Sequence, residues 1–183
     1  MGKLQTADFV EVDDLYAKAG GAGSEAIPYL RWVASKITYD QLTASATTDV
    51  VDLEISLPAN SCVHEVKANL VTTFEAAVAL SQMTCIAGDA TDPNGLLATL
   101  QDLDDDGGTA GWKSPAIDEL GAYLYDSTKK SLTSKLFTSA TDLEATFTAT
   151  GDNLGDLTQG ALVLYFLIST PGAAAVVNKA TTQ

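Results

Sequence analysis

Apolar and polar side chains alternate along several stretches of the chain. In residues 50–57 (VVDLEISL), Val51, Leu53, Ile55 and Leu57 fall at every second position, with acidic or polar side chains between them. Successive side chains of an extended strand point to opposite faces, so this period of two is typical of a strand with one buried face. Residues 141–151 (TDLEATFTATG) alternate in the same way and are predicted to form a second such strand.

Short apolar segments separated by turn signals continue along most of the chain. Residues 161–169 (ALVLYFLIS) are apolar almost without interruption over a strand length, which predicts a strand covered on both faces. Residues 92–95 (DPNG) predict a tight turn, because proline presets φ and Asn-Gly tolerates positive φ. The full set of predicted strands is residues 35–45, 50–57, 62–74, 77–88, 96–103, 121–126, 131–137, 141–151 and 161–169.

Eight or nine short strands without a convincing amphipathic helix predict an all-β domain, either a sandwich or a barrel. We expect an antiparallel jelly-roll sandwich of about eight strands. An immunoglobulin-like sandwich is the alternative, because strand order cannot be read from a single sequence.

The two ends of the chain differ in composition from the predicted sandwich. Residues 1–31 contain a run of small residues at 20–24 (GGAGS), which is typical of a flexible hinge. We therefore expect an N-terminal arm over residues 1–31, in which residues 9–19 could form one or two helical turns. Residues 32–170 are predicted to form the sandwich domain, and residues 171–183 a weakly structured tail.

The charge balance limits the classes of partner. Ten basic and twenty-four acidic residues give a formal net charge of −14, and such a surface repels nucleic acid because phosphate binding depends on Lys and Arg. The acidic N-terminus does not resemble an export signal. The longest apolar run is much shorter than the roughly 20 residues of a membrane-spanning helix. We therefore expect no nucleic-acid or membrane partner and synthesis in a cytoplasm.

Enzyme signatures are mostly absent from the sequence. The single histidine, His64, shares a period-2 face with Cys62 and Val66, which favours a partly buried structural role over catalysis. No serine has a nucleophile-elbow setting, and no glycine-rich loop leads from a strand into a helix. A pair of catalytic carboxylates of the glycosidase kind is an alternative that the sequence does not test, because the fold sets the distance between two carboxylates. Cys62 and Cys85 are predicted to be buried free thiols. We expect a protein that is not an enzyme and has no cofactor.

The acidic stretch 102–108 (DLDDDGG) places Asp102, Asp104, Asp106 and Gly107 in the spacing that opens a calcium-binding loop. The twelfth position of that loop needs a bidentate glutamate, and here it is Lys113, so an EF-hand is excluded. A looser calcium site that also uses Asp118 or Glu119 stays an alternative. We prefer a solvated acidic turn at the end of a strand.

Two groups of aromatic residues are candidates for binding. Trp112, Tyr123 and Tyr125 have the character of a sugar-binding platform, although aromatic residues in strands more often pack in the core or at an edge.

A second group lies where the arm joins the domain. Tyr29, Arg31 and Trp32 belong to residue types that are enriched at protein interfaces. With Phe9 and Tyr16 of the arm, they are the predicted contacts to a partner or a neighbouring subunit.

Three stretches of the sequence resemble a group of small virion proteins of tailed bacteriophages. In this group a strand ends in a Leu-Pro turn, a strand pair leads to a Gly-Asp…Asn-Gly-Leu segment, and a Gly-Asp-Leu-Thr-x-Gly-x-Leu approach precedes the last strand. The matching stretches are residues 53–76 (LEISLPANSCVHEVKANLVTTFEA), 86–104 (IAGDATDPNGLLATLQDLD) and 145–169 (ATFTATGDNLGDLTQGALVLYFLIS). The resemblance covers roughly residues 49–169, with gaps.

The resemblance implies a jelly-roll head decoration protein, also called a capsid cement protein. Such proteins commonly form homotrimers on the outer surface of an icosahedral capsid, bind the major capsid protein at junctions between capsomers, and reach a neighbour with an N-terminal arm. For this chain it implies synthesis in the host cytoplasm and a place on the virion. The alternatives are a phage tail, fibre or baseplate jelly roll that recognises host surface carbohydrate, and a cellular carbohydrate-binding or hydrolytic sandwich domain.

Overall fold

Strands make up almost all of the regular structure in the computed structural model, which describes residues 29–77, 80–170 and 177–178. Two short 3-10 turns, η1 (Tyr39–Gln41) and η2 (Leu154–Asp156), interrupt them. The strands are β1 (Tyr29–Thr38), β2 (Thr48–Leu57), β3 (Ser61–Ala76), β4 (Gln82–Asp89), β5 (Asp92–Leu100), β6 (Gly111–Lys113), β7 (Tyr125–Asp126), β8 (Ser131–Leu132), β9 (Lys135–Phe137), β10 (Thr141–Thr150), β11 (Leu157–Thr170) and β12 (Val177–Asn178).

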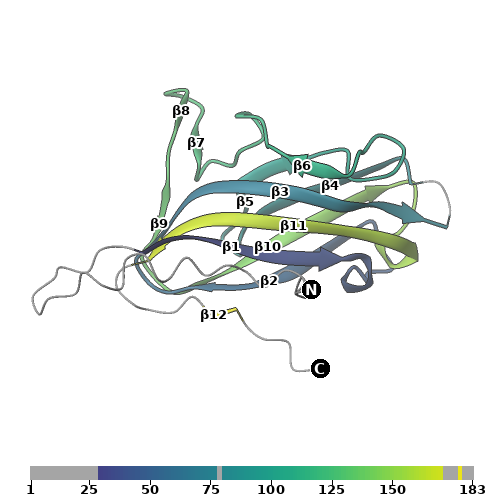
Figure 1. The fold of residues 1–183 in the computed structure, drawn as a ribbon, viewed down its shortest axis with the longest axis horizontal. Coiled ribbons are helices and arrows are strands. Elements are labelled where there is room, and N and C mark those ends of the chain that lie inside the picture. The colour runs from purple at the N-terminus through teal and green to yellow at the C-terminus, as the bar shows by residue number, and fades with distance from the viewer. Residues whose placement is uncertain (1–28, 78–79, 171–176, 179–183) are drawn as a thin grey trace, which may run out of the picture.

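The strands form two antiparallel sheets that pack face to face (Figure 1). Sheet A has the order β1-β11-β3-β6, with β9 also paired to β3, and sheet B has the order β12-β2-β10-β4-β5. Eight principal strands, β1 to β6, β10 and β11, can be numbered 1 to 8 in chain order. Sheet A then has the order 1-8-3-6, and sheet B has the order 2-7-4-5. This order is that of a jelly roll. The predicted fold class is therefore confirmed.

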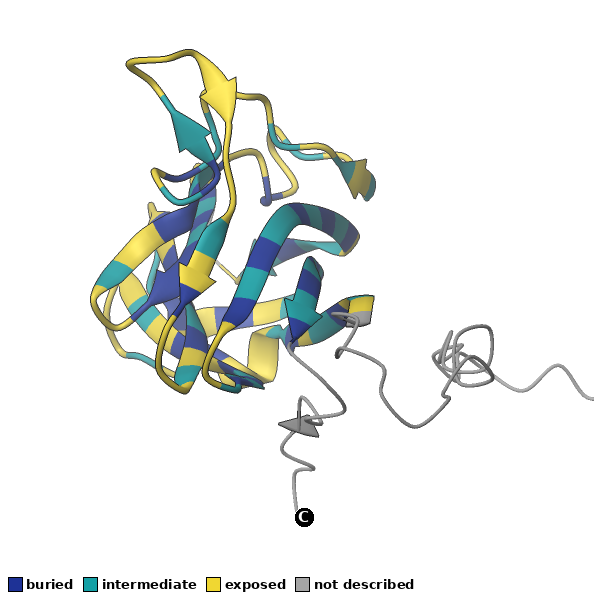
Figure 2. Ribbon diagram, turned by 90° about the vertical axis from the view of Figure 1, so that its left-hand side faces the viewer, coloured by how far each residue is buried: buried dark blue, intermediate teal, exposed yellow. Residues whose placement is uncertain are grey.

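The core lies between the two sheets and follows the predicted alternation. Figure 2 shows buried and more exposed residues taking turns along the strands. At the centre of the core, the rings of Phe74 on β3 and Phe147 on β10 pack across the two sheets with centroids 5.9 Å apart. Gly160 on β11 has φ +141°, and a Cβ atom there would lie 2.1 Å from the Phe74 ring. Glycine is needed at this position because any side chain would overlap that ring.

The last principal strand, β11, is buried on one face only, which corrects the prediction of a strand covered on both sides. Its inward residues Leu162, Leu164, Phe166 and Ile168 are fully buried. The alternate side chains, on the outer surface of sheet A, are only partly buried. In the part of the chain that the structure describes, no further layer covers that surface. One face of this continuous apolar strand thus packs in the core, and its other face belongs to the apolar outer surface of sheet A.

The turn predicted at residues 92–95 is wrong, because these residues already belong to β5. The chain reverses at Ala90 and Thr91, where the Asp89 carboxylate accepts hydrogen bonds from the amides of Thr91 (2.8 Å) and Asp92 (2.9 Å). An aspartate that caps its own turn replaces the Asn-Gly turn. Gly95 has a packing role instead, since a Cβ atom there would lie 2.6 Å from the Tyr123 ring.

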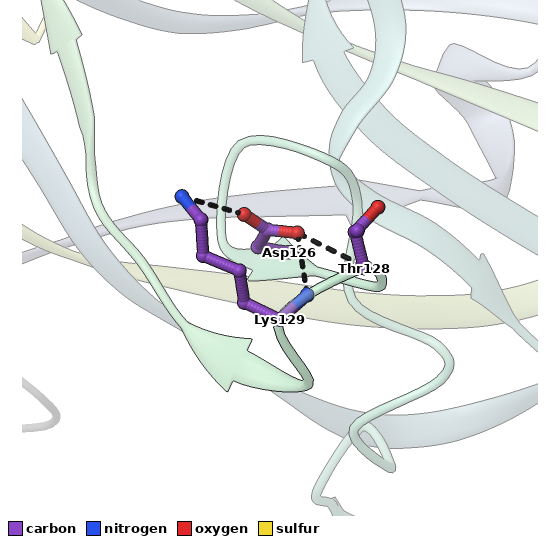
Figure 3. A network of polar contacts seen from close by, with 3 residues as sticks. All are labelled: Asp126, Thr128 and Lys129. Carbon is purple, nitrogen blue, oxygen red and sulfur yellow. Dashed lines mark hydrogen bonds and ion pairs between the residues drawn. The ribbon is translucent and has the colours of Figure 1, made fainter.

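The segment between β6 and β10 contains less strand than predicted. Residues 121–126 and 131–137 yield only the hairpin of β7 and β8, which stands above the sandwich in Figure 1, and the short β9. The Asp126 carboxylate holds this hairpin together (Figure 3). It accepts hydrogen bonds from the amides of Thr128 and Lys129 and lies 3.2 Å from the Lys129 ammonium. These contacts keep the pKa of Asp126 below its ordinary value.

The first strand also differs from its predicted bounds. It begins at Tyr29, inside the segment predicted as the arm, and Tyr39 lies in η1 rather than in the strand. None of the helical turns in the described residues is long and apolar enough to span a membrane.

Candidate interaction surface

The outer surface of sheet A is the most apolar exposed region in the described part of the chain. Residues in register on neighbouring strands lie on the same face. Trp32 pairs with Leu167, and Val163 lies in register with Asn69, which in turn pairs with Trp112. We call this surface the aromatic face and define it by seven residues of β1, β3, β6, β9 and β11: Leu30, Trp32, Lys67, Val71, Trp112, Leu136 and Tyr165.

The aromatic side chains of this face form contacts while much of their surface stays exposed. The rings of Trp112 and Tyr165 have centroids 5.1 Å apart, and the Lys67 ammonium lies 4.8 Å from the centre of the Trp32 ring. Lys67 also forms an ion pair with Glu65 at 3.1 Å. Trp112 remains 64% exposed and Trp32 43% exposed. Large apolar patches of this kind mark contact sites on soluble proteins.

The start of β1 places two of the predicted contact residues on opposite faces of sheet A. Leu30 and Trp32 point to solvent, whereas Arg31 is partly buried and pairs in register with the inward residue Ile168. The Nε and Nη2 atoms of Arg31 are buried and have no hydrogen-bond partner among the described residues. Because a buried guanidinium without an acceptor is costly, this position calls for an anionic partner.

The remaining predicted contact residues give less information. Phe9 and Tyr16 lie outside the described residues. Of Tyr29, the structure describes the backbone, which pairs with Thr170 at the end of β11.

The aromatic platform predicted from Trp112, Tyr123 and Tyr125 is separated in the structure. Tyr123 packs edge-on against Phe137 with centroids 5.9 Å apart, and the Lys135 ammonium lies 3.8 Å from the centre of the Tyr123 ring. Tyr125 lies in β7. The ring partner of Trp112 is instead Tyr165, from a strand some fifty residues further along the chain.

The acidic turn connects the two sheets. Leu103 accepts a hydrogen bond from the Phe74 amide of sheet A (2.8 Å), and its own amide donates to Met83 of sheet B (3.2 Å). Asp104 is buried, and its carboxylate accepts hydrogen bonds from the amides of Met83 (3.0 Å) and Gly107 (3.3 Å).

The turn does not gather the carboxylates that were predicted as weak calcium candidates. Asp102 and Asp106 are exposed, whereas Asp104 points inward. The Lys113 ammonium donates to the carbonyl oxygen of Asp102 (3.3 Å). The described residues contain no group of three or more His, Cys, Asp or Glu arranged to hold a metal ion.

His64 lies between two serines on the outer side of sheet A. Its Nδ1 is 3.1 Å from the Ser134 hydroxyl, and its Nε2 is 2.7 Å from the Ser169 hydroxyl. The imidazole therefore links β3 to β11 and to the segment before β9, which agrees with the predicted structural role. A bulge in β3 between residues 63 and 65 puts His64 and Val66 on opposite faces, so their predicted shared face is wrong.

Both cysteines are free, as predicted, and neither is activated. The predicted burial is confirmed for Cys85 but is wrong for Cys62, which is partly exposed. Burial raises the pKa of both thiols above the ordinary value, more strongly for Cys85. A raised pKa leaves little thiolate for nucleophilic chemistry.

A groove of about 770 Å³ lies at the end of the sandwich where β9 leads into β10. Its lining includes Asp89, Lys135 and Glu144. The Tyr123 hydroxyl donates to Asp89 at 3.4 Å. Burial, the negative charges of Asp89 and Asp92, and this hydrogen bond raise the pKa of Tyr123. The groove is thus acidic and open, and its lysine is engaged with aromatic rings.

No protein-family model matches the chain, and no curated protein matches it. The fold is similar to that of a solved chain. That chain belongs to the capsid asymmetric unit of cyanophage Pam1, with 13% sequence identity and a TM-score of 0.46. The similarity covers 89% of this chain and 100% of the other.

Reasoning from sequence identified Trp32 and Trp112 as candidates and missed the other five members of the aromatic face, among them Tyr165 and Lys67. Tyr165 lies inside the run ALVLYFLIS, where it is the one side chain with a polar group before the final Ser169. A tyrosine in an otherwise aliphatic strand indicates a face that meets water, and this signal could have predicted the open side of β11. Lys67 lies between the buried Val66 and Ala68, and this alternation could have predicted that Lys67 points to the same exposed face.

Proposed function

We propose that this chain is a non-enzymatic structural protein of a bacteriophage virion that decorates and stabilises the outside of an icosahedral capsid. The observation that carries the proposal is the start of β1, which has candidate contact residues on both faces of sheet A. Leu30 and Trp32 are exposed there, and the Arg31 guanidinium has two nitrogen atoms without an acceptor among the described residues. The resemblance of residues 49–169 to phage decoration proteins supports the same reading.

The proposal includes a homotrimer that binds the major capsid protein at capsomer junctions through residues 1–31. The strand that follows residues 1–28 is β1, which contributes Leu30 and Trp32 to the aromatic face. A trimer presents three arms and three footprints, so individually weak contacts add up to strong binding. The net charge of −14 favours a place on the outer surface, away from packaged nucleic acid. No cofactor or membrane takes part in this role.

Removing residues 1–24 is the test of the proposed arm. Residues 1–24 precede β1, the first strand of the sandwich, so the shortened protein is expected to fold and to form the same trimer. Because three linked contacts are lost together, its apparent affinity for undecorated capsids should fall by about 100-fold or more. Capsid sedimentation with labelled protein measures the occupancy.

A variant that lacks residues 179–183 serves as the matched control and should bind like the full chain. Wild-type occupancy by the protein lacking residues 1–24 would overturn the role of the arm. A monomer in mass measurements of the full chain would overturn the trimer.

A second candidate function is recognition of host surface carbohydrate by a tail, fibre or baseplate module. It is favoured by one observation, the exposed Trp112 ring beside Tyr165. If this candidate holds, a glycan found on an array should bind Trp112→Ala about tenfold more weakly, because one aromatic stacking contact contributes ~1 kcal/mol or more.

The matched control for this test is Ile117→Ala, since Ile117 is also exposed but belongs to the segment that bridges to β5 of sheet B through Leu120 and Leu97. Equal loss of binding in the two variants would count against a sugar site at Trp112.

A further inference from the structure

The two outer surfaces of the sandwich differ sharply in character. Of the nine large apolar side chains that are exposed in the described part of the chain, five lie on the aromatic face, namely Leu30, Trp32, Val71, Trp112 and Leu136. The outer surface of sheet B carries one of them, Val50, among threonines and carboxylates. An apolar sheet face of this extent needs a cover, because open apolar surface is costly in water.

The charges around the aromatic face favour an acidic cover. Near Trp32 and Tyr165, the outer surface of sheet A carries Lys36, Lys67 and a single carboxylate, Glu65. In a chain with a net charge of −14, this is a locally basic region. A partner segment that contains both apolar and acidic residues would complement this region.

The N-terminal segment of the same chain has this chemistry. Residues 1–19 contain four acidic residues, at positions 8, 11, 13 and 14, against lysines at positions 3 and 18. The acidic positions are interleaved with apolar ones, which are Phe9, Val10, Val12, Leu15 and Tyr16.

The connection has a suitable length. Nine residues, 20–28, separate residues 1–19 from β1, and a chain of this length can span at most about 30 Å. We call these nine residues the tether. The tether ends at Tyr29, the first residue of the edge strand β1, and ten residues of strand extend about 33 Å. A segment on so short a tether experiences an effective concentration on the order of 1 mM at the face.

We propose that residues 1–19 dock on the aromatic face of their own chain in the free protein. The carboxylates of the segment then meet Lys36 and Lys67, and its apolar residues cover Trp32 and Trp112. This inference concerns the unassembled protein and does not depend on the proposed function.

Both tryptophans of the chain, Trp32 and Trp112, lie on this face, so their fluorescence reports on whatever covers it. We expect the protein lacking residues 1–19 to show red-shifted emission. Its acrylamide quenching constant should be at least about twofold larger than that of the full chain, because the tethered segment is bound most of the time. Circular dichroism checks that both proteins are folded.

Variants and an added peptide make the test specific. Lys36→Glu in the full chain should raise the quenching as the truncation does, whereas Lys130→Glu, on the distant β7–β8 hairpin, should not. A synthetic peptide of residues 1–19 at millimolar concentration should restore protection to the truncated chain. The same peptide with its four acidic residues changed to amides should fail.

Three outcomes would overturn the proposal. Equal quenching of the full and truncated chains means that the segment does not cover the face. Protection of the full chain that disappears on dilution means that a second copy covers it. Protection of the truncated chain by added glycan but not by the peptide assigns the face to carbohydrate.

Discussion

Replacing Phe147 by alanine is expected to lower the free energy of unfolding by about 3–5 kcal/mol. Phe147 is completely buried, lies between β2 and β4 in sheet B, and packs on Phe74 of sheet A with ring centroids 5.9 Å apart. Loss of the ring removes buried apolar surface and leaves a cavity between the sheets, which rigid strands cannot close. Urea unfolding followed by circular dichroism measures the change.

Thr148→Ala is the control for this prediction. Thr148 is the next residue on β10 but points outward and is exposed, so its loss should cost less than about 1 kcal/mol. If the two variants were equally stable, the two sheets would not share the core that the Phe74–Phe147 contact indicates.

Replacing Asp104 by alanine is expected to cost about 2–3 kcal/mol, although Asp104 belongs to a surface turn. Its carboxylate is buried and accepts hydrogen bonds from the amides of Met83 and Gly107. Alanine would leave the buried Met83 amide without an acceptor, and it would loosen the connection between β3 and β4. Thermal unfolding with and without calcium measures both the loss and any metal dependence.

Asp106→Asn is the matched control, because Asp106 is exposed on the same turn. It should change the free energy of unfolding by no more than about 0.5 kcal/mol. A stabilisation by calcium that vanishes in both variants would show that the turn is a calcium site after all.

The positions of strands could be predicted from the sequence where one face of the strand is buried and the other is exposed to solvent. The alternation in residues 50–57 and 141–151 records this asymmetry directly, and both became central strands of sheet B. The jelly-roll strand order was harder to predict from the sequence. It depends on the pairing of β1 with β11 and of β3 with β11, between residues far apart in the sequence.

The errors have local physical causes. The DPNG segment carries every signal of a turn, but the Asp89 carboxylate caps an earlier turn, and Gly95 makes room for Tyr123. The aromatic face was partly predicted, since Trp32 was a contact candidate. Its pairing of Trp112 with Tyr165 was not predicted, because proximity across a sheet depends on strand order.

The eight principal strands begin and end on a single rung, where Tyr29 faces Thr170 across adjacent antiparallel strands. Paired residues of such strands are about 5 Å apart. A peptide fused before β1 and another fused after β11 would therefore be displayed side by side. A short linker across this rung, with new ends opened in the β7–β8 hairpin, would give a circular permutant that keeps all eight principal strands and omits only the two-residue β12.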